Sequence, residues 1–222
     1  CCIREVVMKV VFTMGGITHY LSPLLDNVVR KGVDVVMVIP SVKDNQTIGK
    51  GVKLVNNEAL YQVRYSEIKQ GWYGKTILTD LKTILNEEKP DIVVLGWPYF
   101  LQYFFDRQLR LLIKENNIKL IIREIPFQVP PFGQLSYFKE NPVYDENMIL
   151  QSRGMSFFIR ALCTMYIRKF VYKHADATIN YASCAYDILP SYGVNKDKIF
   201  VTYNTPNTES LIRLREKVLS AP

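Results

Sequence analysis

The sequence predicts an α/β fold, a Rossmann-like three-layer sandwich with about six to seven mostly parallel strands and helices on both faces. Apolar, β-branched runs alternate with segments of helical periodicity along the chain, which is the pattern of successive βαβ units. The strand runs are almost continuously apolar, as expected for strands that are covered on both faces. The 222 residues, of which 48% are hydrophobic and 22% charged, suffice for a domain with a sizeable core.

The first half of the chain opens with a strand at residues 9–14, followed by a Gly15-Gly16 turn. A helix is expected over 18–31, or from Ser22-Pro23 onward, because serine caps helices and proline suits the first turn. Glycine at position 32 ends this helix. The next expected elements are strands at 33–39, 52–55 and 61–65 and a helix at 75–88, which Lys89-Pro90 stops.

The second half predicts strands at 91–95, 118–122, 177–180 and 198–202 and helices at 99–116, 156–174 and 183–192. Residues 126–151 are irregular and proline-rich, and long loops in compact domains are usually functional or mobile. Residues 1–7 are expected to be a tail, 8–203 the domain, and 204–222 a linker toward a further domain. Ligands of such sheets bind beyond the carboxyl ends of the strands.

The net charge of +7 and a pI near 9.1 favour anionic partners, although a generally basic solvated surface explains them equally well. We expect no nucleic-acid partner, because no recognition motif is present. The four cysteines form no CxxC pair and have no histidine at ligand spacing, so no metal site and a reducing, cytoplasmic location are expected. No apolar run reaches the roughly eighteen residues that a bilayer requires.

The turn after the first strand is the first candidate site. Gly15 and Gly16 let the backbone approach a ligand, and the next helix offers free N–H groups to an anion. His19 can donate to a phosphate or titrate near neutral pH. The alternatives are a plain tight turn and an ordinary surface histidine. The GxGxxG pattern is absent, which disfavours binding of NAD or FAD.

Two further candidates follow predicted strands. Trp97 and Tyr99 lie directly after the strand at 91–95, where aromatic faces suit sugar rings; the alternative is core packing of the next helix. Arg123 and Glu124 end the strand at 118–122, where Arg123 could hold a phosphate and Glu124 could orient a hydroxyl or act as a base. The alternative is a mutual salt bridge between them.

The helix at 156–174 combines apolar side chains with positive charges at Arg160, Arg168, Lys169 and Lys173. This pattern can lie on an anionic membrane. A core helix with a basic outer edge explains it as well. His174 ends the helix and is expected to cap its carbonyl groups.

The chain resembles family-four glycosyltransferases in several segments that occur in the family's order. These are residues 8–16 (MKVVFTMGG), 89–94 (KPDIVV), 175–180 (ADATIN), 192–194 (YGV), 197–199 (DKI) and 201–208 (VTYNTPNT). The resemblance covers nearly the whole chain. It implies one half of a GT-B fold, in which two Rossmann-like domains face each other across a cleft.

By this resemblance the chain is the N-terminal, acceptor-binding domain of a retaining, metal-independent hexosyltransferase that acts on a polysaccharide or lipid-linked acceptor. The donor is a nucleotide sugar, held mostly by the second domain, and no cofactor is implied. Gly15, Gly16 and His19 would approach the donor phosphates or the reacting sugar. The basic charge suits lipid-phosphate acceptors at the inner face of the cell membrane. The chain alone is expected to be inactive.

Two departures from the family concern the site and the linker. The family often places a histidine where this chain has Arg123 and Glu124, so Glu124 is a conjectural substitute for that histidine. The catalytic candidates are Glu124 and, separately, His19. Asn204-Thr205 replaces the usual Asn-Gly. A non-catalytic module that binds a phosphorylated small molecule or a protein is the alternative function, favoured if the reading frame ends at Pro222. A third function, that of a nicotinamide-dependent oxidoreductase, is disfavoured because the chain lacks the GxGxxG pattern of such enzymes.

Overall fold

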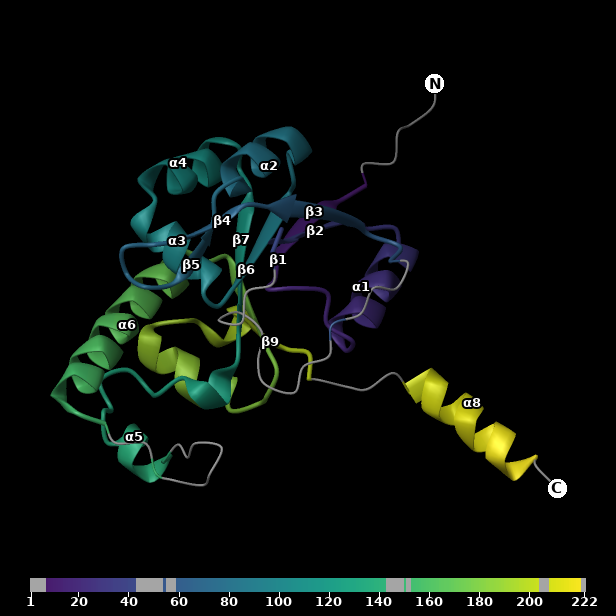
Figure 1. The fold of residues 1–222 in the computed structure, drawn as a ribbon. Helices are drawn as coiled ribbons and strands as arrows, with labels where there is room; N and C mark the ends of the chain where they lie inside the picture. The colour runs from purple at the N-terminus through teal and green to yellow at the C-terminus, as the bar shows by residue number, and fades with distance from the viewer. Residues whose placement is uncertain are drawn as a thin grey trace. The chain divides into compact units, whose positions relative to one another are not determined.

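Strands and helices alternate along the computed structural model, which describes residues 7–42, 54, 59–142, 150, 153–203 and 208–220 (Figure 1). The first part contains β1 (Lys9–Thr13), α1 (Leu21–Arg30), β2 (Asp34–Pro40), β3 (Gln62–Ser66), β4 (Ile68–Gln70), β5 (Thr76–Leu78) and α2 (Leu81–Glu88). The second part contains β6 (Ile92–Gly96), α3 (Tyr99–Phe105), α4 (Arg107–Glu115), β7 (Lys119–Glu124), α5 (Tyr137–Glu140), α6 (Met155–His174), β8 (Ala177–Asn180), α7 (Ala185–Ile188), β9 (Ile199–Val201) and α8 (Thr208–Leu219). Short 3-10 helices lie at Pro126–Gln128, Leu189–Tyr192 and Lys196–Lys198.

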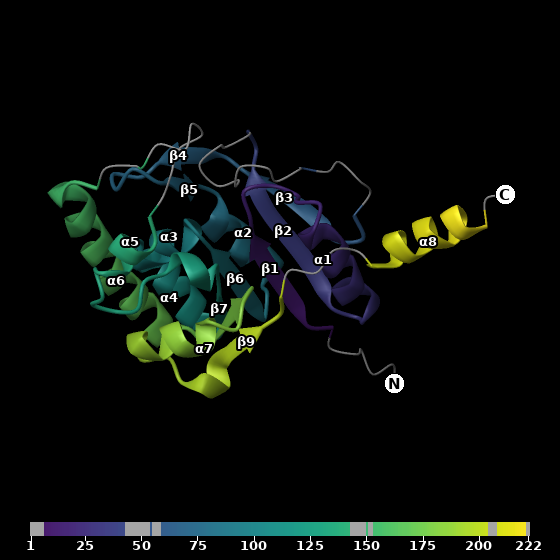
Figure 2. The same ribbon diagram turned by 90° about the horizontal axis from the view of Figure 1, so that it is seen from below.

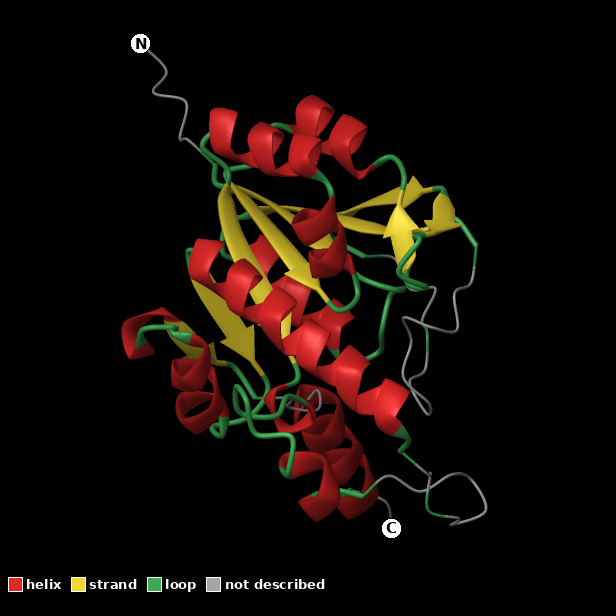
Figure 3. Ribbon diagram, turned by 90° about the vertical axis from the view of Figure 1, so that its left-hand side faces the viewer, coloured by secondary structure: helices red, strands yellow, loops and turns green. Residues whose placement is uncertain are grey.

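Seven strands form one sheet in the order β3-β2-β1-β6-β7-β8-β9, and β4 and β5 form a separate antiparallel pair. The strand pairs β1–β2, β2–β3, β7–β8 and β8–β9 are parallel. Helices accompany the strands (red and yellow in Figure 3). The predicted Rossmann-like α/β fold is confirmed. The strands β1, β2 and β6 carry β-branched, mostly buried runs, as expected for strands that are covered on both faces.

The chain divides into two compact units, Cys1–Val93 with Tyr203–Pro222, and Val94–Thr202. In the first unit an apolar cluster joins α1 to β2 through Leu21, Leu25, Val35, Met37 and Ile39. In the second unit α3 packs against both α4 and α6 (Figure 2). No helix in the described ranges combines the length and the apolar content that crossing a bilayer requires.

The start of the first helix differs from the Ser22-Pro23 prediction. Tyr20 is the residue that precedes α1, and the Ser22 N–H already donates to the Thr18 carbonyl at 3.0 Å. Ser22 therefore lies inside the helix. Its hydroxyl accepts a hydrogen bond from the buried Tyr61 hydroxyl at 2.9 Å, so it packs α1 against the segment that leads into β3.

The prediction of a helix over 75–88 is wrong for residues 75–80. Thr76–Leu78 is strand β5, and α2 begins only at Leu81. The Thr79 N–H donates to the Glu67 carbonyl at 2.9 Å, and Asp80 accepts from the Glu67 N–H at 2.7 Å. These bonds hold the segment against Glu67, which lies between β3 and β4, and helical periodicity does not show such pairing.

The helix predicted over 99–116 is broken at Asp106. The backbone of Asp106 is extended, and its carboxylate accepts from the Leu109 N–H at 3.1 Å, which caps α4. The helix predicted over 183–192 is similarly divided into α7 and a 3-10 helix. The strand predicted at 52–55 lies outside the described residues except for Leu54, which bridges Thr18.

Candidate functional site

The candidate site of the second unit lies at the carboxyl ends of its parallel strands. The strand β7 extends to Glu124, so Arg123 and Glu124 lie within it and not after it as predicted. Glu124 pairs in register with Asn180 of β8. Because side chains alternate along a strand, Glu124 and Arg123 point to opposite faces of the sheet.

Glu124 is a buried carboxylate whose partners come from α6. Its side chain is 4% exposed, and its Oε2 accepts hydrogen bonds from the Tyr172 hydroxyl at 2.7 Å and from Arg168 Nε at 3.2 Å. Arg168 and Tyr172 are four residues apart, so they share one face of the helix. A buried charge is tolerated only when it is paired and hydrogen-bonded, and both conditions are met here.

Ionisation in this cluster is fixed at neutral pH. Burial, together with the negative charge of Glu124, raises the pKa of Tyr172 well above its usual range. Burial raises the pKa of Tyr192 to about 12, and its hydroxyl donates to the Pro130 carbonyl at 2.7 Å. Burial would lower the pKa of Arg168, but the adjacent Glu124 outweighs it and the net shift is upward. The phenols therefore remain neutral and the guanidinium charged.

Arg168 also contacts Trp97, one of the two aromatic residues predicted for the site. Its guanidinium lies over the Trp97 ring at 5.2 Å and over the Phe100 ring at 5.8 Å from the centroids, within cation–π range. Trp97 is 37% exposed, whereas Tyr99 is fully buried in α3. Of the two aromatic side chains predicted for the site, Trp97 alone therefore has surface that a ligand can reach.

Arg123 forms a second contact at the same edge. Its guanidinium lies 4.4 Å from the centre of the Tyr181 ring, which follows β8. The alternative of a mutual Arg123–Glu124 salt bridge is not what the structure shows, because Glu124 pairs with Arg168 across 44 positions of sequence. Arg168 itself was expected on a basic outer edge, but its side chain is 11% exposed.

The remaining predicted site residues lie in the first unit. Gly15 and Gly16 follow β1, and Gly16 is buried. His19 is exposed and meets the Tyr20 ring edge-on at 5.4 Å. The structure thus brings Trp97 and Glu124 together through Arg168 in one unit, while Gly15, Gly16 and His19 belong to the other.

Arg168, Tyr172, Tyr181 and Asn180 were missed as site residues. The i,i+4 spacing of an arginine and a tyrosine on an apolar helix was the available signal for the first two. Asn180 is fully buried, and its Oδ1 has no hydrogen-bond partner among the described residues. The described ranges contain no group of three or more histidine, cysteine, aspartate or glutamate side chains that could hold a metal ion.

Comparison with known proteins gives no family. No protein-family model and no curated protein matches the chain. Among solved structures, a UDP-N-acetylglucosamine 2-epimerase from Rickettsia bellii is 15% identical with a TM-score of 0.49, over 97% of this chain and 49% of that one. A second UDP-N-acetylglucosamine 2-epimerase is 17% identical with a TM-score of 0.49, over 89% and 48%. The chain spans about half the length of these structures.

A dTDP-glucose 4,6-dehydratase from Bacillus anthracis, solved with NAD, is more distant. It is 12% identical with a TM-score of 0.41, over 78% of this chain and 54% of that one. All three are enzymes of sugar nucleotides by name. At such identities and TM-scores the likeness has no bearing on the activity or the ligands of this chain.

The buried pair should dominate the stability of the second unit. Glu124→Gln or Arg168→Met alone leaves one charge buried without its partner, so each should lower the free energy of unfolding by about 3–5 kcal/mol. The double variant should lose less than the sum of the two losses. Urea unfolding at pH 7 measures this, with Lys173→Met on the exposed side of α6 as the control, expected within about 0.5 kcal/mol of wild type. Strict additivity of the two losses would contradict the pairing.

The buried phenols should make the fold sensitive to alkaline pH. The pKa of Tyr192 is about 12 in the folded chain, and an unfolded tyrosine ionises near pH 10, so unfolding releases a proton between these values. Stability is unaffected by this group below about pH 10 and should fall as the pH rises toward about 12. Tyr192→Phe should reduce the slope by up to about 1.4 kcal/mol per pH unit. Tyr186→Phe, at an exposed tyrosine, is the control, and equal slopes for both variants would contradict the assignment.

Proposed function

We propose that the chain is the acceptor-binding part of a retaining, metal-independent GT-B glycosyltransferase that transfers a sugar from a nucleotide sugar to a polysaccharide or lipid-linked acceptor. The order of the family-like segments along the sequence supports this proposal. The observation that carries it is an accessible aromatic ring, Trp97, directly after β6, together with a cationic side chain, Arg123, in the last two residues of the neighbouring strand β7.

The chemistry of these two groups suits a phosphorylated glycan acceptor. In the proposal the accessible surface of Trp97 stacks on the apolar face of a sugar ring, and Arg123, oriented by Tyr181, holds the phosphate. Glu124 acts through Arg168, because its Oε2 already accepts two hydrogen bonds from α6. In the first unit, taken by itself, Gly15, Gly16 and His19 are the residues that the proposal assigns to the donor phosphates or the reacting sugar, with His19 as a catalytic candidate.

The helix α8 fits the role of a connection to the donor-binding part. Its exposed apolar side chains have no cover within the described chain: Leu211, Ile212, Leu214, Val218 and Leu219. Exposed apolar surface of this kind marks a contact with another protein surface. The donor-binding domain is the surface that the proposal assigns to it.

Acceptor binding should depend on both groups of the site. Farnesyl phosphate, a short lipid phosphate, should bind the chain measurably in calorimetry, whereas farnesol should bind far more weakly. Arg123→Ala should weaken the binding of farnesyl phosphate at least tenfold, since a lost charge-assisted contact is worth about 1.5–3 kcal/mol. Lys196→Ala, at an exposed lysine of the same unit, should have no effect. Equal binding of the alcohol and the phosphate, or equal loss in both variants, would refute the acceptor site.

The same proposal places the chain at the inner face of the cell membrane through α6. One face of this helix carries four exposed apolar side chains at spacings of three and four residues: Met155, Ile159, Leu162 and Tyr166. Exposed positive charges accompany them at Arg160, Lys169 and Lys173. An apolar face flanked by basic residues binds anionic membrane surfaces.

Vesicle binding tests this contact. Vesicles that contain phosphatidylglycerol should bind the chain more strongly than pure phosphatidylcholine vesicles, and Ile159→Glu/Tyr166→Glu should reduce the binding several-fold by placing charges in the apolar face. The control is Leu24→Glu/Tyr65→Glu, two exposed apolar positions of the first unit with the same change of charge. Equal binding to both vesicle types in a sedimentation assay would remove the membrane contact from the proposal.

A further inference from the structure

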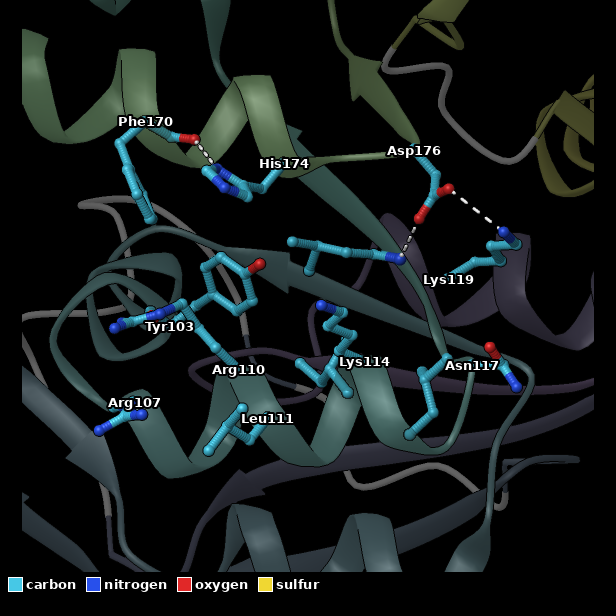
Figure 4. A pocket seen from close by; sticks show the side chains of 13 residues that line it. Tyr103, Arg107, Arg110, Leu111, Lys114, Asn117, Lys119, Phe170, His174 and Asp176 are labelled. Atoms are coloured by element: carbon cyan, nitrogen blue, oxygen red, sulfur yellow. Dashed lines mark hydrogen bonds and ion pairs between the residues drawn. The ribbon is translucent and has the colours of Figure 1, made fainter.

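A cavity of about 520 Å³ opens at the amino-terminal end of β7, away from the candidate site (Figure 4). One wall is α4, and the opposite wall is the last turn of α6 with Phe170 and His174. The strand β7 begins here at Lys119 and reaches the candidate site at Glu124. Five residues of strand separate the two ends by about 17 Å, so the cavity is a separate place in the same unit.

The side chains that line this cavity carry more positive than negative charge. Arg107, Arg110 and Lys114 lie at i, i+3 and i+7 on α4, which places them on one face of the helix, and Lys119 adds a fourth cation. Asp176 is the one carboxylate among the lining residues. We define these five residues as the cationic cavity.

Asp176 neutralises only Lys119 among these four cations, because its carboxylate is already engaged. One oxygen accepts from the Leu120 N–H at 2.9 Å, and the other lies 3.5 Å from Lys119 Nζ. Arg107 and Lys114 form no ion pair with any described residue. Two cations without an ion pair that share one concave surface attract an anion more strongly than the same charges on a convex one.

The remaining polar groups of the cavity are held in place. Arg110 donates to the Tyr103 carbonyl at 2.9 Å and to the Phe104 carbonyl, and it lies 5.8 Å from the centre of the Phe170 ring. His174 Nδ1 lies 2.8 Å from the Phe170 carbonyl, as expected for a capping histidine, and its ring stacks on Phe170 at 4.2 Å. A carbonyl only accepts, so Nδ1 carries the proton and Nε2 is the nitrogen that a ligand can use.

We propose that the cationic cavity binds a phosphate-bearing ligand, at a site distinct from the proposed acceptor edge. Arg107 and Lys114 lie seven residues apart, about 10.5 Å along the helix axis. This separation suits a ligand with two phosphate groups or a diphosphate with an attached organic part. The organic part has apolar surface available at Leu111 and Phe170, which also line the cavity.

Calorimetric titration of the 222-residue chain with inorganic pyrophosphate tests the site. The wild-type chain should bind, and Arg107→Glu/Lys114→Glu should weaken the affinity at least tenfold without changing the circular dichroism spectrum. Lys196→Glu/Lys198→Glu makes the same change of net charge at exposed positions of the same unit and should stay within twofold of wild type. Any binding of pyrophosphate that Arg123→Ala removes and Arg107→Glu/Lys114→Glu retains belongs to the proposed acceptor edge, which separates the two sites.

A second arm identifies the source of the phosphate. If Arg107→Glu/Lys114→Glu also loses binding to phosphatidylglycerol vesicles while the control variant keeps it, the ligand is a lipid headgroup. If vesicle binding is unchanged and pyrophosphate binding is lost, the ligand is a soluble phosphate compound. Absence of pyrophosphate and vesicle binding by the wild-type chain, or equal losses in the two charge-reversal variants, would overturn the proposal.

Discussion

The burial of one carboxylate, Glu124, constrains the second unit more than any other single feature. A charge that is 4% exposed must be neutralised and hydrogen-bonded where it lies. Arg168 and Tyr172 fulfil this requirement from one face of α6, so the carboxylate fixes the rotation and the register of that helix against β7. The same guanidinium then extends over Trp97 and holds the indole at the end of β6.

Glu124 and Arg123, which were predicted from the sequence to lie in one candidate site, have different surroundings and different roles in the structure. Glu124 faces α6 and organises the interior, whereas Arg123 faces the other side of the sheet and lies on Tyr181. The alternation of side chains along β7 produces this division. The strand also separates two groups of positively charged side chains, with Arg123 near its carboxyl end and the cationic cavity at its amino end. Each region has its own ligand in the proposals above.

Much of the fold was predictable because its information is local. The strand at 177–180 was placed at its observed bounds, and the other strands of the sheet that the structure describes were located to within two residues of their ends, since fully covered strands read as apolar β-branched runs. One error came from strand pairing and the other from a local side-chain cap. Thr76–Leu78 was expected to be helical but pairs with β4. The segment 99–116 was expected to be one helix, but the Asp106 side chain caps a second helix, α4, within it.

The candidate site was predictable only in part. Trp97, Arg123 and Glu124 could be named because each lies at the end of a strand, and ligands of parallel sheets bind there. The partners on α6 could not be named, because that helix is apolar on most of its circumference and its periodicity does not show which side is covered. Arg168 was therefore expected outside, yet it pairs with Glu124 from 44 positions away.

Arg168, which is held by the buried Glu124, fixes the indole ring of Trp97 in place, and one spectroscopic comparison tests this directly. The chain has two tryptophans, so Trp72→Phe leaves Trp97 as the only one. Time-resolved fluorescence anisotropy at pH 7 should show an indole fixed on the nanosecond timescale in this variant. Adding Arg168→Met should release nanosecond motion of the ring while the far-ultraviolet circular dichroism is retained. Unchanged anisotropy after the loss of Arg168 would contradict the account.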